Sequence, residues 1–170
     1  YLFLPDIDSS TTSKLHKLCD AHPNNCFPMA GLHPTSVKAS YKDELHHVEK
    51  QLDERKNIVA IGEVGIDLYW DDTFRKEQEI SFRHQIELAL QHALPIVIHS
   101  RNSTQEIINI LNDYKGKGLR GVFHCYSGSL KQAEQICEMG FFLGIGGVLT
   151  FKNASIRDVV KNTGLQHLLL

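Results

Sequence analysis

The chain has 170 residues, of which 42% are hydrophobic and 22% are charged, and its formal net charge is −2 with histidine neutral. This length and composition are typical of a globular protein, so we expect residues 1–170 to form a single domain. The small net charge excludes a basic field spread over the whole surface, although a few local Arg or Lys residues could still hold phosphates. No apolar stretch reaches the roughly 18 residues that a membrane-spanning helix needs, so we expect no membrane partner.

The four cysteines and the two chain ends give further expectations. The cysteines show no C-x-x-C spacing, so we interpret them as reduced thiols of a cytoplasmic protein. No signal peptide is visible, and nothing indicates an obligate protein partner. The chain opens on Tyr1-Leu-Phe-Leu and closes on His167-Leu-Leu-Leu, which both resemble the middle of a buried strand. We therefore expect an internal piece of a longer protein.

Short apolar runs alternate with helix-period segments along the chain. The runs predict strands near residues 1–4, 27–31, 58–62, 95–98, 120–123, 141–145 and 167–170. The segments between them predict helices near residues 11–21, 43–55, 77–93, 104–113, 130–139 and 155–162. In the third of these helices, one apolar stripe recurs at helical spacing: Phe82, Ile86, Ala89, Leu90 and Ala93.

Strict alternation of strands and helices predicts an α/β protein with a parallel sheet. Seven strands at near-uniform spacing favour a (β/α)₈ TIM-type barrel over an open sheet. A full barrel takes about 250 residues, so we expect an incomplete one. The first strand–helix unit and the segment after the last strand would be missing.

Each of three predicted strands is followed directly by a residue of a type that commonly binds metals. Glu63 follows Ile58-Val-Ala-Ile-Gly, His99 follows Leu94-Pro-Ile-Val-Ile, and His124 follows Leu119-Arg-Gly-Val-Phe. The carboxyl ends of parallel strands meet at one rim, so these side chains form a candidate metal-ligand set for a hydrolase. Cys125 is an alternative to His124, and because side chains alternate along a strand, only one of the two should face the site.

Four further residues lie next to these positions. His33, in Gly31-Leu-His-Pro34, could equally be a ligand, a substrate contact or a structural residue. Arg101 could bind a phosphate through its two-pronged guanidinium, or form a surface salt bridge. Asp67 and Tyr69 could serve the site, or order a loop with Trp70 packed beneath it.

Five ordered blocks resemble the TatD family of metal-dependent deoxyribonucleases, and together they cover essentially the whole chain. The blocks are Gly31-Leu-His-Pro34, Ala60-Ile-Gly-Glu-Val-Gly-Ile-Asp67, Leu94-Pro-Ile-Val-Ile-His-Ser-Arg101, Gly121-Val-Phe-His-Cys-Tyr-Ser-Gly128 and Gly144-Ile-Gly-Gly-Val-Leu-Thr-Phe-Lys152.

The resemblance implies a two-metal barrel enzyme that hydrolyses DNA with Mg²⁺, Mn²⁺ or Zn²⁺. Glu63 would bridge both metals, and His99 and His124 would complete the second site. His33 and Arg101 would lie at the substrate cleft, so the implied catalytic residues are Glu63, His33 and Arg101. The chain lacks the family's His-x-His pair and stops before its Glu-Thr-Asp segment, so at most one metal would be fully liganded. The Asp that would activate the attacking water is also absent.

Three hypotheses about function remain at this point. The first is a two-metal deoxyribonuclease, and the second is an amidohydrolase-like enzyme acting on a small amide, ester or lactone. A cleft lined by Arg and Lys would favour DNA, whereas an enclosed apolar pocket would favour a small molecule. The third is an inactive truncated fragment, whose exposed strand edges would make it poorly soluble or oligomeric.

Overall fold

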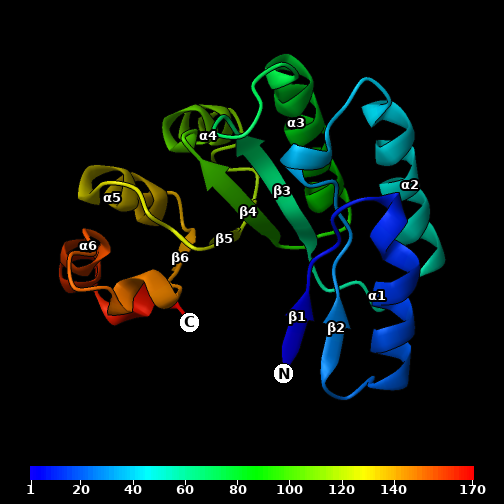
Figure 1. Ribbon diagram of the computed structural model, residues 1–170, viewed down its shortest axis with the longest axis horizontal. Helices are drawn as coiled ribbons and strands as arrows, with labels where there is room; N and C mark the ends of the chain where they lie inside the picture. The colour runs from blue at the N-terminus through cyan, green and yellow to red at the C-terminus, as the bar shows by residue number, and fades with distance from the viewer.

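The structure, a computed structural model, describes all residues 1–170, and parallel strands alternate with helices along it (Figure 1). The strands are β1 (Leu2–Leu4), β2 (Cys26–Pro28), β3 (Ile61–Asp67), β4 (Ile96–Arg101), β5 (Gly121–Phe123), β6 (Phe142–Gly144) and β7 (Leu168–Leu169). The α-helices are α1 (Ser9–Ala21), α2 (Tyr41–Glu54), α3 (Arg75–Gln91), α4 (Thr104–Asn112), α5 (Leu130–Glu138) and α6 (Ile156–Thr163). Three short 3₁₀ helices cover Pro34–Ser36, Gly147–Thr150 and Leu165–His167. None of the helices combines the length and the apolar character that crossing a membrane would require.

The seven strands lie side by side in chain order and form one curved layer, the wall of an open barrel. Strands β3 to β7 make one parallel sheet, and β1 pairs with β2 in a second. A bridge between Ala30 and Ile61 joins the two sheets, and the backbone of Asp6 exchanges hydrogen bonds with Gly62 and Glu63. The wall is open between β1 and β7, whose ends face each other across a gap (Figure 1). These two strands and the ends of β4 to β6 line a cavity of about 680 Å³ there.

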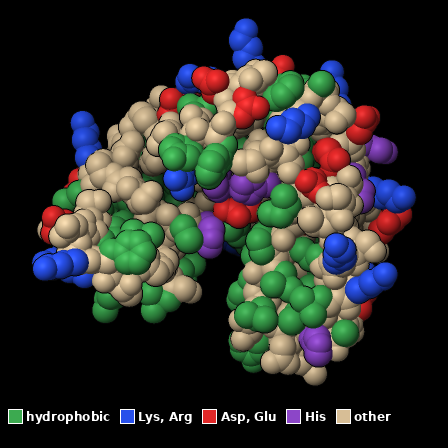
Figure 2. All heavy atoms as spheres, in the orientation of Figure 1, with side chains coloured by type: hydrophobic (Ala, Val, Ile, Leu, Met, Phe, Trp, Pro, Cys, Tyr) green, Lys and Arg blue, Asp and Glu red, His purple; other side chains and the backbone are tan.

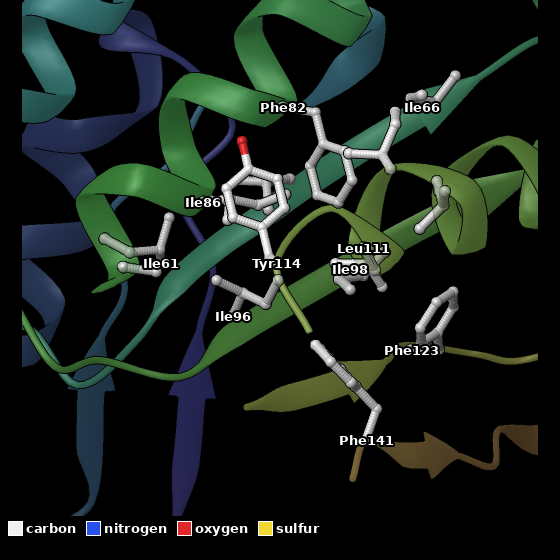
Figure 3. Packing of buried hydrophobic residues seen from close by; sticks show 14 of the residues in the cluster. Ile61, Ile66, Phe82, Ile86, Ile96, Ile98, Leu111, Tyr114, Phe123 and Phe141 are labelled. Atoms are coloured by element: carbon white, nitrogen blue, oxygen red, sulfur yellow. The ribbon is translucent and has the colours of Figure 1, made fainter. Parts of the chain in front are cut away.

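The core lies between the strands and the helices that cover their outer face. Phe82 and Ile86 of α3 are fully buried, and Figure 3 shows them packed over β3 and β4. The predicted stripe is correct for these two residues and for Ala89. It is wrong for Ala93, which is exposed, because α3 ends at Gln91 and Ala93 has a positive φ of 54°.

Strand β3 is longer than the sequence predicts, and this places the candidate site. The expected strand ended at residue 62, whereas β3 continues to Asp67 with every residue buried. Gly65 makes this possible, since a Cβ there would lie 2.0 Å from the carbonyl oxygen of His99 on β4. Glycine therefore lets β3 approach β4 closely, with Glu63 on one side of it and Asp67 on the other.

Candidate metal centre

Three side chains from neighbouring strands converge at the carboxyl end of the wall. His33 follows β2, Glu63 lies within β3, and His99 lies within β4. Glu63 Oε1 is 3.4 Å from His99 Nδ1, and Glu63 Oε2 is 4.0 Å from His33 Nε2. One ligand atom from each of the three lies within 4.8 Å of the other two, close enough to share an ion. Figure 2 shows histidine and acidic side chains together at the centre of the molecule, where its two lower halves meet.

The second nitrogen of each imidazole has a partner of its own. His99 Nε2 lies 2.8 Å from Asp67 Oδ2, so Nε2 donates its proton to that carboxylate. Nδ1 donates to Glu63 when the ring is charged, and it presents a lone pair towards Glu63 when the ring is neutral, as it must be to bind an ion. This carboxylate–histidine pairing is characteristic of metal-binding histidines. His33 Nδ1 accepts from the Thr35 backbone N–H, which puts the ring proton on Nε2, towards Glu63. For Nε2 to bind an ion, Nδ1 would have to donate instead to Thr35 Oγ1, 2.7 Å away.

The ionisable groups of this cluster shift one another's pKa values. Burial raises the pKa of Glu63, but the hydrogen bond from His99 and the charges of the nearby histidines, His124 among them, outweigh it and lower the pKa. Burial and the charge of His99 lower the pKa of His33 and keep that ring neutral. Burial also opposes protonation of His99, but its hydrogen bonds to Glu63 and Asp67 raise its pKa above the usual value. An ionised carboxylate beside two imidazoles suits a divalent cation such as Mn²⁺ or Zn²⁺.

Asp67 serves both the cluster and the loop that follows β3. Its side chain is only 2% exposed. While Oδ2 accepts from His99, Oδ1 accepts from the backbone N–H groups of Tyr69 and Trp70, at 2.9 and 3.2 Å. The expectation that Trp70 packs beneath this loop is wrong, because 72% of its surface is exposed. Ordering comes from the Asp67 carboxylate rather than from a buried indole.

Two buried glutamines of α3 hold the backbone around the site, and sequence reasoning missed them. Gln78 accepts from the backbone N–H of Asp67 at 2.8 Å and donates to its carbonyl at 3.2 Å. Gln85 does the same for Leu32, the neighbour of His33, at 2.7 and 3.2 Å. The sequence spacing could have revealed them, because Gln78, Phe82 and Gln85 share the buried face of the helix at i, i+4 and i+7.

His124 lies apart from the three-residue cluster. Its side chain is exposed, and its Nε2 lies 3.3 Å from the sulfur of Cys125. Strand alternation does not decide which of this pair faces the site, because alternation holds within a strand and β5 ends at Phe123. The chain turns at Cys125, where φ is 46°, and both side chains line the open cavity.

Arg101 ends β4, directly opposite Asp67 in the strand register. Its guanidinium forms no hydrogen bond or salt bridge with the protein, so the surface salt bridge considered above is not formed. It lies instead over the ring of Tyr69, 4.3 Å from the centroid. A cation without a carboxylate partner therefore stands beside the cluster.

Comparison with known proteins places the chain in a family. The model of the family described as "TatD related DNase" matches residues 1–170. The chain belongs to the TatD family. This TatD-family chain is 37% identical over 141 residues to "Uncharacterized metal-dependent hydrolase YabD" of Bacillus subtilis, with 82% of this chain and 55% of the relative covered. It is 30% identical over 146 residues to "3'-5' ssDNA/RNA exonuclease TatD" of a Pantoea species, with 86% and 56% covered.

A solved structure confirms the architecture. The crystal structure of YjjV, a TatD homologue from Escherichia coli, matches with a TM-score of 0.91 at 30% identity, covering 99% of this chain and 65% of that one. The TatD-family chain spans about half the length of the curated relatives it matches. The predicted family and the predicted α/β barrel, open in this structure, are confirmed.

Proposed function

We propose that this TatD-family protein is a divalent-metal-dependent hydrolase, and specifically a deoxyribonuclease. The observation that carries the proposal is the cluster of His33, Glu63 and His99 beside the unpaired guanidinium of Arg101. A phosphodiester needs both a cation at its reacting oxygens and a donor for its remaining charge. The names of the relatives, metal-dependent hydrolase and ssDNA/RNA exonuclease, support the same chemistry.

Each residue of the cluster has a role in this proposal. Glu63 and His99 present free ligand atoms and would hold the ion, with His33 as the third donor once its proton shifts. His124, expected from the sequence as a ligand, remains a candidate to complete the set by rotation of its exposed side chain. A bound Mg²⁺, Mn²⁺ or Zn²⁺ would supply the positive charge that stabilises developing negative charge on phosphate oxygens.

The chain's own residues would also orient the substrate. The Arg101 guanidinium can donate two parallel hydrogen bonds to a phosphate, because no carboxylate competes for it. With no ion on His33, its Nε2–H, which faces Glu63, would be able to donate to a substrate oxygen at the cluster. Asp67 keeps the His99 ring in one orientation throughout.

The alternative, hydrolysis of a small amide, ester or lactone, calls for an enclosed pocket over the cluster. The cavity between β1 and β7 is lined mostly by apolar residues, but its wall contains His124 and Cys125 and none of His33, Glu63 and His99. It also opens between β1 and β7 rather than closing around a ligand. A nucleic acid strand lying across the exposed rim fits these surroundings better.

The test is cleavage of end-labelled single-stranded DNA by the purified protein with Mg²⁺ or Mn²⁺. We expect cleavage that EDTA abolishes and that Glu63→Gln reduces to the uncatalysed background. Glu54→Gln is the matched control, because Glu54 is an exposed carboxylate whose ion pair is with Lys50, and this variant should cleave normally. Cleavage that persists in Glu63→Gln or in EDTA would contradict the proposal, as would the absence of cleavage by the unaltered protein.

A further inference from the structure

Two large aromatic side chains stand in solvent directly beside the metal centre. Trp70 is 72% exposed and Tyr69 is 53% exposed. Their rings meet edge to face, with centroids 4.9 Å apart and an interplanar angle of 86°. Exposed aromatic pairs of this kind leave a large apolar area uncovered, which marks an interaction site more often than a structural need.

The backbone that carries the pair is held in place by a buried carboxylate. Asp67 Oδ1 accepts hydrogen bonds from the backbone N–H groups of both Tyr69 and Trp70. Arg101 covers one face of the Tyr69 ring at 4.3 Å, so the open stacking surface is the indole of Trp70. An indole carried on such a backbone offers a large stacking area and has only two side-chain torsions to fix on binding.

The position of the pair relative to the cluster fits a polymeric substrate. Tyr69 lies two residues beyond Asp67, whose carboxylate touches His99, and two residues of chain span at most ~7 Å. A strand with a phosphate at the cluster would therefore bring a flanking base within reach of Trp70. Because Asp71 and Asp72 follow Trp70 and repel phosphates, the strand's backbone would pass on the Arg101 side.

We propose that Trp70, Tyr69 and Arg101 form a binding site for single-stranded nucleic acid, in which a base stacks on the Trp70 indole and Arg101 contacts the adjacent phosphate. This proposal rests on the proposed nuclease function and adds the residues that would bind the strand beside the cluster. Every base has a face that can stack on an aromatic ring, so the site would be tolerant of sequence. A duplex hides its base faces and would bind the site poorly.

The first experiment uses Trp70 itself, since it is the only tryptophan of the chain. The unaltered protein is titrated in EDTA, which prevents cleavage, with an oligothymidylate of about a dozen nucleotides, in the range of single-strand site sizes. We expect saturable quenching of the tryptophan emission, and at least fivefold weaker apparent affinity for a duplex of the same length. Binding seen by anisotropy of a labelled oligonucleotide without any change in emission would overturn the proposal, as would equal affinity for the duplex.

The second experiment separates stacking from charge. By anisotropy, Trp70→Ala should weaken binding of the single strand about 5- to 150-fold with an unchanged salt dependence, and Trp70→Phe should restore most of the loss. Arg101→Ala should instead lower the slope of log affinity against log salt by about 0.7, the value for one phosphate on a single strand. Unchanged affinity in Trp70→Ala would overturn the stacking role, and an unchanged slope in Arg101→Ala would overturn the phosphate contact.

Matched controls come from the opposite end of the strands. Lys117 lies over the Tyr114 ring at 4.7 Å, a cation–aromatic pair like that of Arg101 but remote from the cluster. Tyr1 is an exposed aromatic residue just before β1. Lys117→Ala and Tyr1→Ala should both bind the single strand as the unaltered protein does, and a loss equal to that of Trp70→Ala would overturn the site's location.

The outcomes also distinguish this proposal from the proposed function. Metal-dependent DNA cleavage with no contribution from Trp70 would overturn the stacking site and leave the nuclease function standing. Quenching of Trp70 by single strands without cleavage under any divalent metal would support the site and contradict the nuclease function. Failure to bind any nucleic acid would contradict both.

Discussion

Asp67→Asn tests whether a single hydrogen bond prepares His99 for a metal ion. The asparagine carbonyl can take the place of Oδ1 and keep the hydrogen bonds from Tyr69 and Trp70. Its NH₂ group then replaces Oδ2 and donates to His99 Nε2, 2.8 Å away in the native protein. The His99 proton must therefore move to Nδ1, where it removes the lone pair that faces Glu63.

The expected magnitude follows from ligand linkage. At a metal concentration of about 100 times the dissociation constant, binding stabilises the native protein by about 2.7 kcal/mol. Loss of such a supporting partner weakens metal binding about 10- to 100-fold, which reduces the increment to about 0.4–1.4 kcal/mol. The fold itself should lose little, because the loop hydrogen bonds survive. Asp67→Ala, which removes all three, should cost about 3 kcal/mol or more even without metal.

The assay is urea unfolding with and without Mn²⁺, with EDTA as the metal-free baseline. Asp71→Asn is the matched control, because Asp71 is an exposed carboxylate four residues further on. This variant should keep the full gain in the free energy of unfolding that Mn²⁺ gives the unaltered protein. If Asp67→Asn keeps the full increment as well, the carboxylate does not set the His99 tautomer. If the unaltered protein shows no increment at all, the cluster does not bind the ion and the proposed function loses its basis.

Three further predictions follow from the structure. His33→Ala should weaken Mn²⁺ binding, measured by calorimetry, more than His124→Ala does, because His33 and not His124 lies in the cluster; the reverse order would favour the ligand set expected from the sequence. Phe82→Ala should lower the free energy of unfolding by about 3–5 kcal/mol in urea, since Phe82 is fully buried; a loss below about 1 kcal/mol would mean that the core repacks there. The chain should self-associate at micromolar concentration in light scattering, because the edges of β1 and β7 and their exposed apolar residues lie at the opening; a monomer at high concentration would refute this.

Much of the fold could be predicted because it depends on local patterns. Each predicted helix begins and ends within two residues of an observed one, since apolar spacing marks the buried face of a helix. The end of β3 was missed because Gly62, Glu63 and Gly65 resemble a turn. These residues form a strand because they pair closely with β4. That contact is a tertiary feature, which a local sequence pattern does not report.

The proximity of two candidate ligands could be predicted for the same reason. Glu63 and His99 lie on adjacent strands of one sheet, so their meeting follows from strand order. The part played by His33 depends on how sharply the wall curves between β2 and β3, which no local pattern reports. His124 lies in a turn after a strand of three residues, where the direction of a side chain depends on a positive φ rather than on alternation.

The two glutamines of α3 imply that the site opens as a unit. The amide hydrogens of Leu32 and Asp67 belong to two different segments, the loop after β2 and the end of β3, yet each is held by a side chain of the same helix. Neither amide can exchange with solvent deuterium until α3 releases it. The two should therefore share one protection factor, and any loosening of α3 would disperse His33 and Asp67 together.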